Sequence, residues 1–309
     1  MTMHGAGLQA GKADFGQIYA QPDPRAYYTV LGQLDYQIPQ HGSEVFEAVV
    51  ERRREAVDEP VTVLDLCCSY GVVPALINHD VSLDDLYERY TEQAEDLGAE
   101  ELAEHDRRWF GSRRRTDPVR TIGLDSSERA VGYAEDANLI DAGFGENLEQ
   151  DHPSEGLQEE LGDVDVITVT GGIGYIGERT FDRILTHTPD QPPPWIAALC
   201  LRWIPFEPIA RVAEQHGLVA EPVPDATFPQ RAFRDDVERA TVLEHLDRLD
   251  LDPTGREADG YHHADLYVAR PREHVEALPV EELADELLER EPGEEPLVRT
   301  PLPSVSTPG

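Results

Sequence analysis

Short apolar runs rich in β-branched residues recur through the middle of the chain, and each is followed by a stretch with helical spacing of apolar positions. Such runs are typical of buried parallel strands, and the spacing i, i+3, i+4 is typical of helices that cover a sheet. Strands are predicted at residues 61–66, 120–125, 144–148, 164–169 and 195–201. The repeated alternation of strand and helix predicts an α/β fold with a Rossmann-like, doubly wound parallel sheet.

Two further strands, predicted at 218–223 and 264–269, end the α/β pattern. No crossover helix of the usual kind separates them, so we expect an antiparallel strand pair at the C-terminal edge of the sheet. The acidic segment 233–249 between them is predicted to be a helical insert. A second acidic helical insert is predicted at 82–117.

The chain divides into four predicted parts. Residues 1–16 are small, Gly-rich and without periodicity, which predicts a disordered N-terminus. Residues 17–57 predict an N-terminal helical lid that carries several tyrosines, and residues 58–271 predict the Rossmann-like domain with its inserts. Residues 272–309 are acidic and end rich in proline, which predicts a tail with one short helix. No apolar stretch has the length of a signal peptide or a membrane span, so we expect a cytoplasmic protein.

Acidic residues dominate the charge: the sequence has 62 Asp and Glu against 26 Lys and Arg, a formal net charge of -36. One interpretation is a halophilic-type surface adapted to a salty cytosol, and the other is an ordinary protein with acidic inserts and an acidic tail. The near-absence of lysine favours the first, since Lys12 is the single lysine. Without a basic patch, binding to nucleic acid or to an anionic membrane is not expected.

The scarcity of lysine also excludes several enzyme classes. A Walker A loop, a pyridoxal phosphate site and the common short-chain dehydrogenases each need a lysine, and Lys12 lies in the segment predicted to be disordered. The nucleophile elbow Gly-x-Ser-x-Gly is absent. Cys67 and Cys68 are adjacent and form neither a disulfide framework nor a metal pair. His262 and His263 are also adjacent, so they point to opposite faces of a strand, and no metal site is expected.

Polar or small residues follow the predicted strands at the edge of the sheet where this fold binds ligands. They are the turn 67–71, Asp125, the segment 147–151 and the segment 170–174. A carboxylate at the place of Asp125 can accept hydrogen bonds from both hydroxyls of a ribose, and an N-capping role is its alternative. The first turn lacks the Gly-x-Gly-x-x-Gly spacing that a dinucleotide needs. A ligand with a ribose and no pyrophosphate fits better, and S-adenosylmethionine is such a ligand.

Three segments resemble the motifs of class I S-adenosylmethionine-dependent methyltransferases. VLDLCCSYG at 63–71 is similar to the first motif, GLD at 123–125 to the second and DVITVTG at 165–171 to the fourth. The runs LDYQIPQH, LDLCCSYG, TVTGGIGYI and EADGYHHADLYVARP resemble a group of such sequences without a known substrate, over roughly residues 14–271. Cys67 and Ser69 depart from the pattern, because they stand where the family has glycines.

The resemblance implies S-adenosyl-L-methionine as the cofactor and a set of residues that bind it. The methionine portion would lie against the first turn, the ribose against Asp125 and the adenine against the segment 147–151. For Asp65, a helix-capping or loop-tying role is the alternative. The implied cofactor-binding residues are Asp65, Cys67, Ser69, Gly71, Asp125, Ser126, Asn147, Leu148, Asp151, Thr170, Gly171 and Gly172.

Methyl transfer needs no nucleophile on the enzyme, so alignment of donor and acceptor can carry most of the catalysis. Tyr175, directly after the fourth strand, and His41 are the candidate catalytic residues on the acceptor side. Packing of the loop is the alternative role for Tyr175. Tyr19, Tyr36 and His262 are further candidates on that side.

The predicted function is therefore methyl transfer to a small-molecule acceptor. The alternative is a non-catalytic Rossmann-like protein that binds S-adenosylmethionine or another nucleoside as a sensor or interaction module. A nicotinamide-dependent oxidoreductase is a weaker alternative, because the phosphate-binding glycines are missing. Methylation of nucleic acid is not expected, since the charge opposes it and TGGI at 170–173 stands where an Asn-Pro-Pro-Tyr/Phe motif would be.

Overall fold

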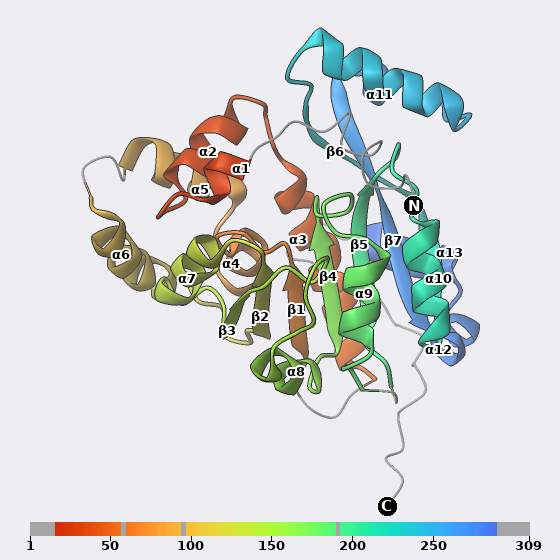
Figure 1. Ribbon diagram of the computed structural model, residues 1–309, viewed down its shortest axis with the longest axis horizontal. Coiled ribbons are helices and arrows are strands. Elements are labelled where there is room, and N and C mark those ends of the chain that lie inside the picture. Colours follow the sequence, from red (N-terminus) through yellow and green to blue (C-terminus); the bar gives the residue numbers. More distant parts are fainter. Residues whose placement is uncertain (1–15, 57–59, 94–96, 190–191, 289–309) are drawn as a thin grey trace, which may run out of the picture.

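Seven strands form one mixed sheet in the order β3-β2-β1-β4-β5-β7-β6 (Figure 1). The computed structural model describes residues 16–56, 60–93, 97–189 and 192–288. Strands β1 to β5 run parallel, whereas β7 runs antiparallel to both β5 and β6. The strands are β1 (Thr62–Leu66), β2 (Arg120–Asp125), β3 (Ala142–Gly145), β4 (Val166–Thr170), β5 (Trp195–Leu201), β6 (Leu218–Ala232) and β7 (Tyr261–Pro271). This architecture confirms the predicted Rossmann-like sheet with an antiparallel C-terminal strand pair.

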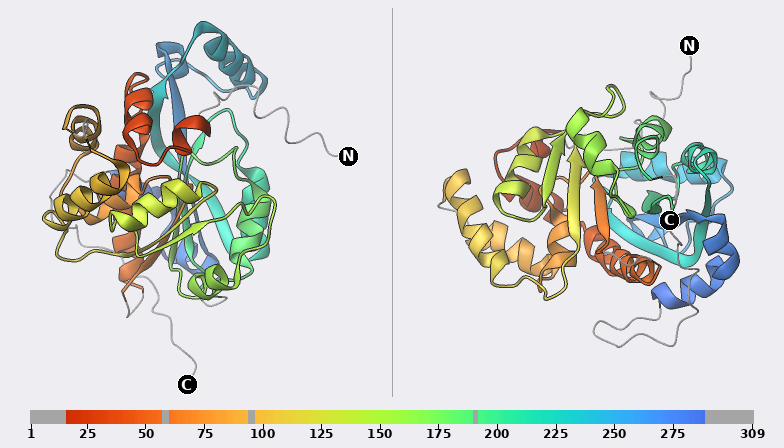
Figure 2. Two further views of the ribbon diagram at one scale, coloured as in Figure 1. Left: turned by 60° about the vertical axis from the view of Figure 1, so that its left-hand side comes forward. Right: turned by 90° about the horizontal axis from the view of Figure 1, so that it is seen from below.

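Helices cover both faces of the sheet and its carboxyl edge (Figure 2). A π-helical turn, Arg89–Gln93, and a 3-10 turn, Glu257–Asp259, occur beside the α-helices. The α-helices of the described residues are α1 (Gly16–Tyr19), α2 (Arg25–Gly32), α3 (Ile38–Arg54), α4 (Val72–Asn78), α5 (Leu83–Glu88), α6 (Ala99–Gly111), α7 (Glu128–Asp136), α8 (Glu155–Leu161), α9 (Glu178–Leu185), α10 (Glu207–Gln215), α11 (Asp236–Arg248), α12 (Arg272–Ala277) and α13 (Val280–Leu288).

The central strands read as continuous apolar runs because both of their faces are buried. Every residue of β1 and of β5 is buried. Alternate side chains enter different cores: Leu64 packs with α8, α9 and α10, and Val63 packs with α3 and α13 on the opposite face. The two faces are separated in the view from below in Figure 2. Burial on both faces therefore explains why the central strands can be located in the sequence from their apolar runs.

The last two strands are longer than predicted. β6 continues to Ala232 although Pro222, Pro224 and Pro229 interrupt its apolar pattern. Proline cannot donate to a strand ladder, but β6 is the edge strand, and register shifts in its pairing with β7 accommodate the interruptions. The hairpin rises beyond the sheet and carries α11, the predicted insert 233–249, near its tip (Figure 1).

The helices α1 and α2 lie beside the insert that holds α5 and α6 (Figure 1). Asp106 of α6 is fully buried, and it accepts hydrogen bonds from Arg89, Tyr90 and Tyr133. Tyr133 belongs to α7, so this carboxylate ties the insert to the Rossmann-like core. Tyr28 of α2 stacks on Tyr90 at 4.7 Å between ring centroids. Of the segment predicted as a lid, α3 covers a face of the sheet and only α1, α2 and the loop to α3 lie at the carboxyl edge.

Residues 272–288 differ from the predicted tail, because they form two helices that pack on the core. Leu278 and Leu283 are fully buried in the cluster that contains α3 and β7. The spacing of apolar residues in α13 gives that helix one buried face. The expected disorder of 1–15 and the Pro-rich end at 289–309 lie outside the described residues. Within the described residues, no helix is both long and apolar enough to span a membrane.

Candidate active site at the carboxyl edge of the sheet

A cavity of about 710 Å³ opens where the parallel strands end. The strand order reverses between β1 and β4, and this switch point is where open α/β sheets bind ligands. The turns after β1, β2 and β4 form one side of the cavity, and α1, α2 and the loop to α3 form the other. The residues that line it are Gly16, Tyr19, Ala20, Tyr27, Tyr36, Pro39, Asp65, Cys67, Cys68, Ser69, Val72, Val73, Asp125, Ser126, Ser127, Thr170, Gly171, Gly172 and Tyr175.

The turn after β1 passes through the left-handed region at three alternate residues. The φ angles are +58° at Cys67, +51° at Ser69 and +77° at Gly71. Glycine adopts such angles freely, whereas other residues pay roughly 1–2 kcal/mol each. Gly71 also has no room for a side chain, because a Cβ there would lie 3.0 Å from the Cβ of Leu139. These φ angles favour glycine at all three positions. Cys67 and Ser69 therefore adopt a strained backbone conformation.

Gly172, after β4, lets the two turns approach each other closely. A Cβ on Gly172 would lie 2.7 Å from the Sγ of Cys67, closer than real atoms come. The thiol of Cys67 therefore packs under the turn 170–172. Cys68 is buried, and its Sγ packs against Gly123 of β2, where a Cβ would lie 2.9 Å away. Three free cysteines, Cys67, Cys68 and Cys200, are present, as the sequence indicates.

Asp125, the last residue of β2, joins the first two turns. One carboxylate oxygen accepts the backbone N–H of Ser69 at 3.0 Å, and the other accepts that of Ser127 at 2.9 Å. Burial raises the pKa of Asp125, while hydrogen bonds from the backbone N–H groups of the serines oppose the rise. The N-cap of α7 is Ser127 and not Asp125. Each carboxylate oxygen keeps further capacity to accept a hydrogen bond from a ligand.

Asp65 lies deeper, one residue before the end of β1. It is buried and accepts a hydrogen bond from the Oγ1 of Thr168 at 2.8 Å. Burial raises the pKa of Asp65 to about 7; the bond from Thr168 opposes this rise, and the charge of Asp125 adds to it. Among the described residues the side chain caps no helix, and its bond to Thr168 joins the neighbouring strands β1 and β4 rather than tying a loop. It also lines the cavity, so a cationic ligand group there would favour its charged form.

Two buried hydroxyls in the cavity wall have no hydrogen-bond partner among the described residues. They are the Oγ of Ser69 and the Oγ1 of Thr170. A buried hydroxyl without a partner costs free energy, and native proteins satisfy most of them. Both oxygens are buried, and that of Thr170 faces Gly42 of α3, so a ligand could bond to either one only after its side chain rotates.

Four tyrosines line the cavity together with the turns that follow the strands. Tyr27 of α2 makes edge contacts with Tyr19 at 5.8 Å and with Tyr36 at 6.2 Å between ring centroids. Tyr175, from the loop after β4, is 49% exposed and stands at the cavity mouth. Burial raises the pKa of Tyr19, and the neighbouring hydroxyls of Tyr36 and Tyr175 raise it further. The phenol groups of Tyr19, Tyr27 and Tyr36 therefore stay protonated at neutral pH.

The backbone around these tyrosines is held by specific hydrogen bonds. Ser127 donates its hydroxyl to the carbonyl of Tyr19 at 2.5 Å, which fixes α1 to the start of α7. Gln37 donates its N–H to the carbonyl of Gln230 on β6 at 2.9 Å, next to Tyr36. The loop with Tyr36 is thus attached to the β6–β7 hairpin, and α1 with Tyr19 is attached to the start of α7.

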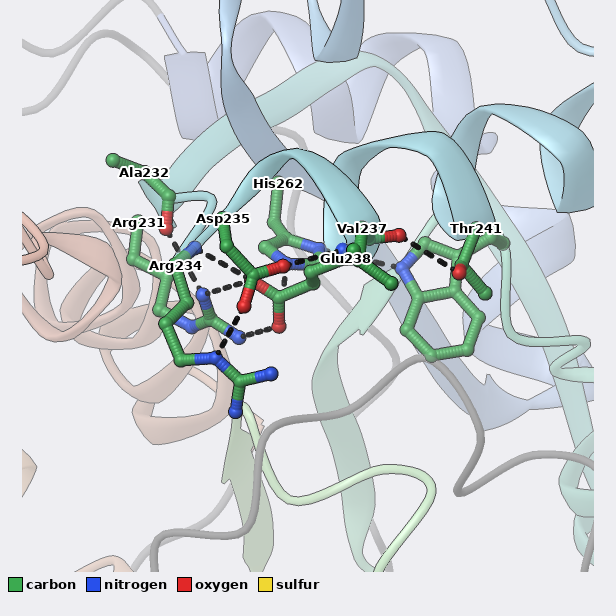
Figure 3. Close-up of polar contacts among 9 residues, drawn as sticks. Arg231, Ala232, Arg234, Asp235, Val237, Glu238, Thr241 and His262 are labelled. Atoms are coloured by element: carbon green, nitrogen blue, oxygen red, sulfur yellow. Dashed lines mark hydrogen bonds and ion pairs between the residues drawn. The ribbon is translucent and has the colours of Figure 1, made fainter.

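A buried ion pair supports the hairpin behind Tyr36 (Figure 3). Arg231 of β6 donates two hydrogen bonds to Glu238 of α11, at 2.7 Å and 3.0 Å. Burial acts to raise the pKa of Glu238, but hydrogen bonds from His262, Arg231 and the N–H of Arg234 hold it well below its usual range. Figure 3 shows Arg231 and His262 both directed at the Glu238 carboxylate.

The structure brings most of the predicted site residues together. Those that line the cavity are Asp65, Cys67, Ser69, Asp125, Ser126, Thr170, Gly171, Gly172 and Tyr175, with Tyr19 and Tyr36 from the further candidates. Gly71 shapes the first turn without lining the cavity. Sequence reasoning did not assign Tyr27 to the site, although its position between Tyr19 and Tyr36 in a tyrosine-rich segment was a usable signal.

Five predicted residues lie away from the described cavity lining. His41 of α3 stacks on Phe228 at 5.4 Å, and His262 is buried beside Trp203 in the hairpin. The segment with Asn147, Leu148 and Asp151 forms a turn whose carbonyls accept hydrogen bonds from Arg183. The Oδ1 of Asn147 accepts the N–H of Glu149, and the side chain of Leu148 enters the core. Local turn formation, which composition alone does not show, directs this segment away from the cavity.

Several solved methyltransferase structures are similar to the chain at low identity. The plantazolicin methyltransferase BpumL in complex with SAH shares 13% identity, covers 86% of this chain and 95% of its own, and has a TM-score of 0.37. The magnesium protoporphyrin IX methyltransferase ChlM from Synechocystis PCC 6803 with bound SAM shares 11% identity, with coverages of 85% and 89% and a TM-score of 0.39. A TehB-like SAM-dependent methyltransferase from Corynebacterium glutamicum shares 14% identity, with coverages of 72% and 86% and a TM-score of 0.36.

Comparisons at the level of sequence give no relative. No family model matches the chain, and no curated protein matches it. Structural likeness at such low identity and TM-score supports no conclusion about function. What the cavity binds must therefore be inferred from its own residues.

Proposed function

We propose that the chain is an S-adenosylmethionine-dependent methyltransferase that acts on a small-molecule acceptor. The observation that carries this proposal is the place of Asp125, at the carboxyl end of β2, lining the cavity with both oxygens held by backbone N–H groups. A carboxylate so placed is suited to the two hydroxyls of a ribose. The missing glycine pattern disfavours the pyrophosphate of a dinucleotide.

The residues of the cavity fit such a ligand. Its volume of about 710 Å³ lies in the usual range for small-molecule sites. Asp125 would hold the ribose, and Ser126 would lie on the adenine side. Asp65 would face the amino-acid portion, where an ammonium group restores its charge.

The chain's own residues would bind and orient more than react. S-adenosylmethionine supplies, when bound, a methyl group on a positively charged sulfur. Thr170 and Gly172 would lie beside that group, and Tyr175 would close the mouth of the cavity over the acceptor. Alignment of two bound reactants and exclusion of water supply several kcal/mol of catalysis without a protein nucleophile. The three free thiols suit a reducing compartment, so we place the protein in the cytoplasm.

Calorimetric titration of S-adenosylmethionine and S-adenosylhomocysteine in molar salt tests the proposal. Wild type should bind both at micromolar concentration, and Asp125→Asn should bind about 100-fold more weakly, because two charge-assisted hydrogen bonds are lost. Asp163→Ala removes an exposed carboxylate that does not line the cavity, and it should bind as wild type does. Folded wild type that binds neither compound would contradict the proposal. Binding without turnover across acceptor panels would favour the non-catalytic alternative.

A further inference from the structure

Part of the cavity wall is an aromatic compartment. We define it by Tyr19, Tyr27, Tyr36, Tyr175 and Pro39, which all line the cavity. The ring of Tyr27 stands at its centre, in edge contact with Tyr19 and Tyr36. Its tyrosines come from three different chain segments, namely α1, α2 with the loop to α3, and the loop after β4.

The charge of the cavity wall has one sign. Asp65 and Asp125 line it, and no Lys, Arg or His is among the described residues of the lining. An anionic acceptor such as a carboxylate or a phosphate would therefore meet two carboxylates and no cation. Coulomb repulsion and the loss of hydration both oppose the binding of such a group.

Arg231 is the cation that acts on Tyr36 from behind the compartment, and it is already paired. Its guanidinium donates to both oxygens of Glu238 and to the carbonyl of Ala232 at 2.9 Å (Figure 3). Both side chains are buried, with 6% and 2% exposed. Turning Arg231 toward an acceptor would leave Glu238 as a buried charge without its partner, which costs several kcal/mol.

Among the described residues, the tyrosines of the compartment offer no base to a hydroxyl acceptor. Burial raises the pKa of Tyr19, Tyr27 and Tyr36, so none of these phenols is a phenolate near neutral pH. Asp65 lies below the first turn and bonds to Thr168 on β4. The residues of the compartment therefore suit an acceptor whose reacting atom needs neither a cation to bind it nor a base to activate it.

We infer that the aromatic compartment takes an acceptor whose reacting atom is a nitrogen with a free lone pair near neutral pH, such as an aromatic ring nitrogen, and that it rejects carboxylates and phosphates. The inference rests on the proposed methyl transfer. A neutral nitrogen gives its lone pair to the methyl carbon, the carbon–sulfur bond breaks with its electron pair passing to sulfur, and the nitrogen keeps the positive charge. A proton of the nitrogen, where one is present, then leaves to water. The faces of the tyrosine rings stabilise the cation that develops.

Four probes that share one ring test this inference by binding: benzyltrimethylammonium, benzylamine, benzyl alcohol and benzoate. They are titrated by calorimetry, and by tyrosine fluorescence, into wild type in molar salt with and without saturating S-adenosylhomocysteine. Molar salt screens the general attraction of an acidic surface for cations. Benzyltrimethylammonium should bind at least tenfold more tightly than benzyl alcohol, and benzoate should not bind. Benzoate that binds as tightly as the ammonium compound overturns the inference.

Variants of Tyr175 locate the binding. Tyr175 is half-exposed, so its replacement leaves the core intact. Tyr175→Leu should weaken binding of the ammonium probe about tenfold, and Tyr175→Phe should retain it, because the ring face and not the hydroxyl carries the attraction. Tyr19→Leu should act as Tyr175→Leu does, and unchanged selectivity in both leucine variants overturns the inference. Failure of S-adenosylhomocysteine to bind concerns the proposed function alone, since the titrations without it still measure the selectivity of the compartment.

Discussion

The carboxylate of Asp125 accepts the backbone N–H of Ser69 at 3.0 Å, so the acid that ends β2 holds the turn that follows β1. Its second oxygen holds the N–H of Ser127, at the start of α7. Two turns that are distant in sequence thereby form one wall. These two hydrogen bonds fix the orientation of the carboxylate, which lowers the ordering cost of binding a ligand there.

Replacement of Ser69 should separate backbone strain from the role of its hydroxyl. Ser69→Gly should be more stable than Ser69→Ala by about 1 kcal/mol, because only glycine adopts φ near +51° without a steric cost. Denaturation in guanidinium chloride measures the difference. Gly71→Ala serves as a reference. It should be less stable than either Ser69 variant, because it adds a Cβ at 3.0 Å from the Cβ of Leu139. Equal stability of the two Ser69 variants would show that the turn relaxes.

Loss of one partner of the Arg231–Glu238 pair should destabilise the hairpin strongly. Glu238→Leu leaves the guanidinium of Arg231 buried without a counter-charge, and we expect a loss of about 3–5 kcal/mol in the free energy of unfolding. The double variant Arg231→Met with Glu238→Leu should recover most of that loss, because the charge and its partner are removed together. A double variant as unstable as the single one contradicts this account of the pair.

Stability should fall as the pH decreases from about 6.5 to about 4, in part through His274. Burial lowers the pKa of His274 to about 4, and the charges of Arg53, Arg270 and Arg52 act in the same direction. The unfolded chain binds the proton near pH 6.5 and the folded chain does not, so acid favours unfolding in this window. The shift corresponds to on the order of 3 kcal/mol.

His274→Gln is the matched variant, since a glutamine oxygen can still accept the bond that the Nε1 of Trp195 donates at 2.9 Å. Its free energy of unfolding, measured from pH 7.5 to pH 4, should decline less steeply than that of wild type. Parallel pH profiles for the two proteins would mean that His274 is protonated in the folded state.

Salt should stabilise the protein near neutral pH. The formal net charge of -36 makes the folded chain repel itself, and raising KCl from 0.1 M to 1 M shortens the screening length from about 10 Å to about 3 Å. The midpoint of thermal unfolding should rise by several degrees over this range. At pH 4.5, close to the sequence pI of about 4.4, the rise should nearly vanish. A rise of equal size at both pH values would assign the effect to general salting-out.

The strands of the sheet could be predicted where burial produces a continuous apolar run. β2 and β5 occupy the predicted residues, β1 begins one residue later than predicted, and β4 begins two residues later and ends one residue later. The third strand, β3, was placed two residues late, because its sequence AGFG lacks β-branched residues. β6 was cut short because its prolines imitate a loop, and only its place at the sheet edge makes them compatible with a strand.

The site could be predicted where the topology alone fixes it, at the ends of parallel strands. Asp125 and the turns after β1 and β4 meet there whatever the loops do. His41 could not be placed, because the face that a residue of α3 presents depends on the packing of the helix against β6. Tyr27 was missed for a similar reason, since its contact with Tyr19 and Tyr36 arises from the fold of α1 and α2.

The central claim is that Asp125 binds the ribose of S-adenosylmethionine, and a thermodynamic cycle tests it most directly. S-adenosylhomocysteine and its 2′,3′-dideoxy analogue are titrated by calorimetry into wild type and into Asp125→Asn. Wild type should bind the dideoxy compound about 100-fold more weakly than S-adenosylhomocysteine, and Asp125→Asn should show a much smaller difference between the two, because its neutral amide makes only weaker hydrogen bonds to the hydroxyls. Equal sensitivity of both proteins to loss of the hydroxyls, or no binding of S-adenosylhomocysteine by wild type, would contradict the claim.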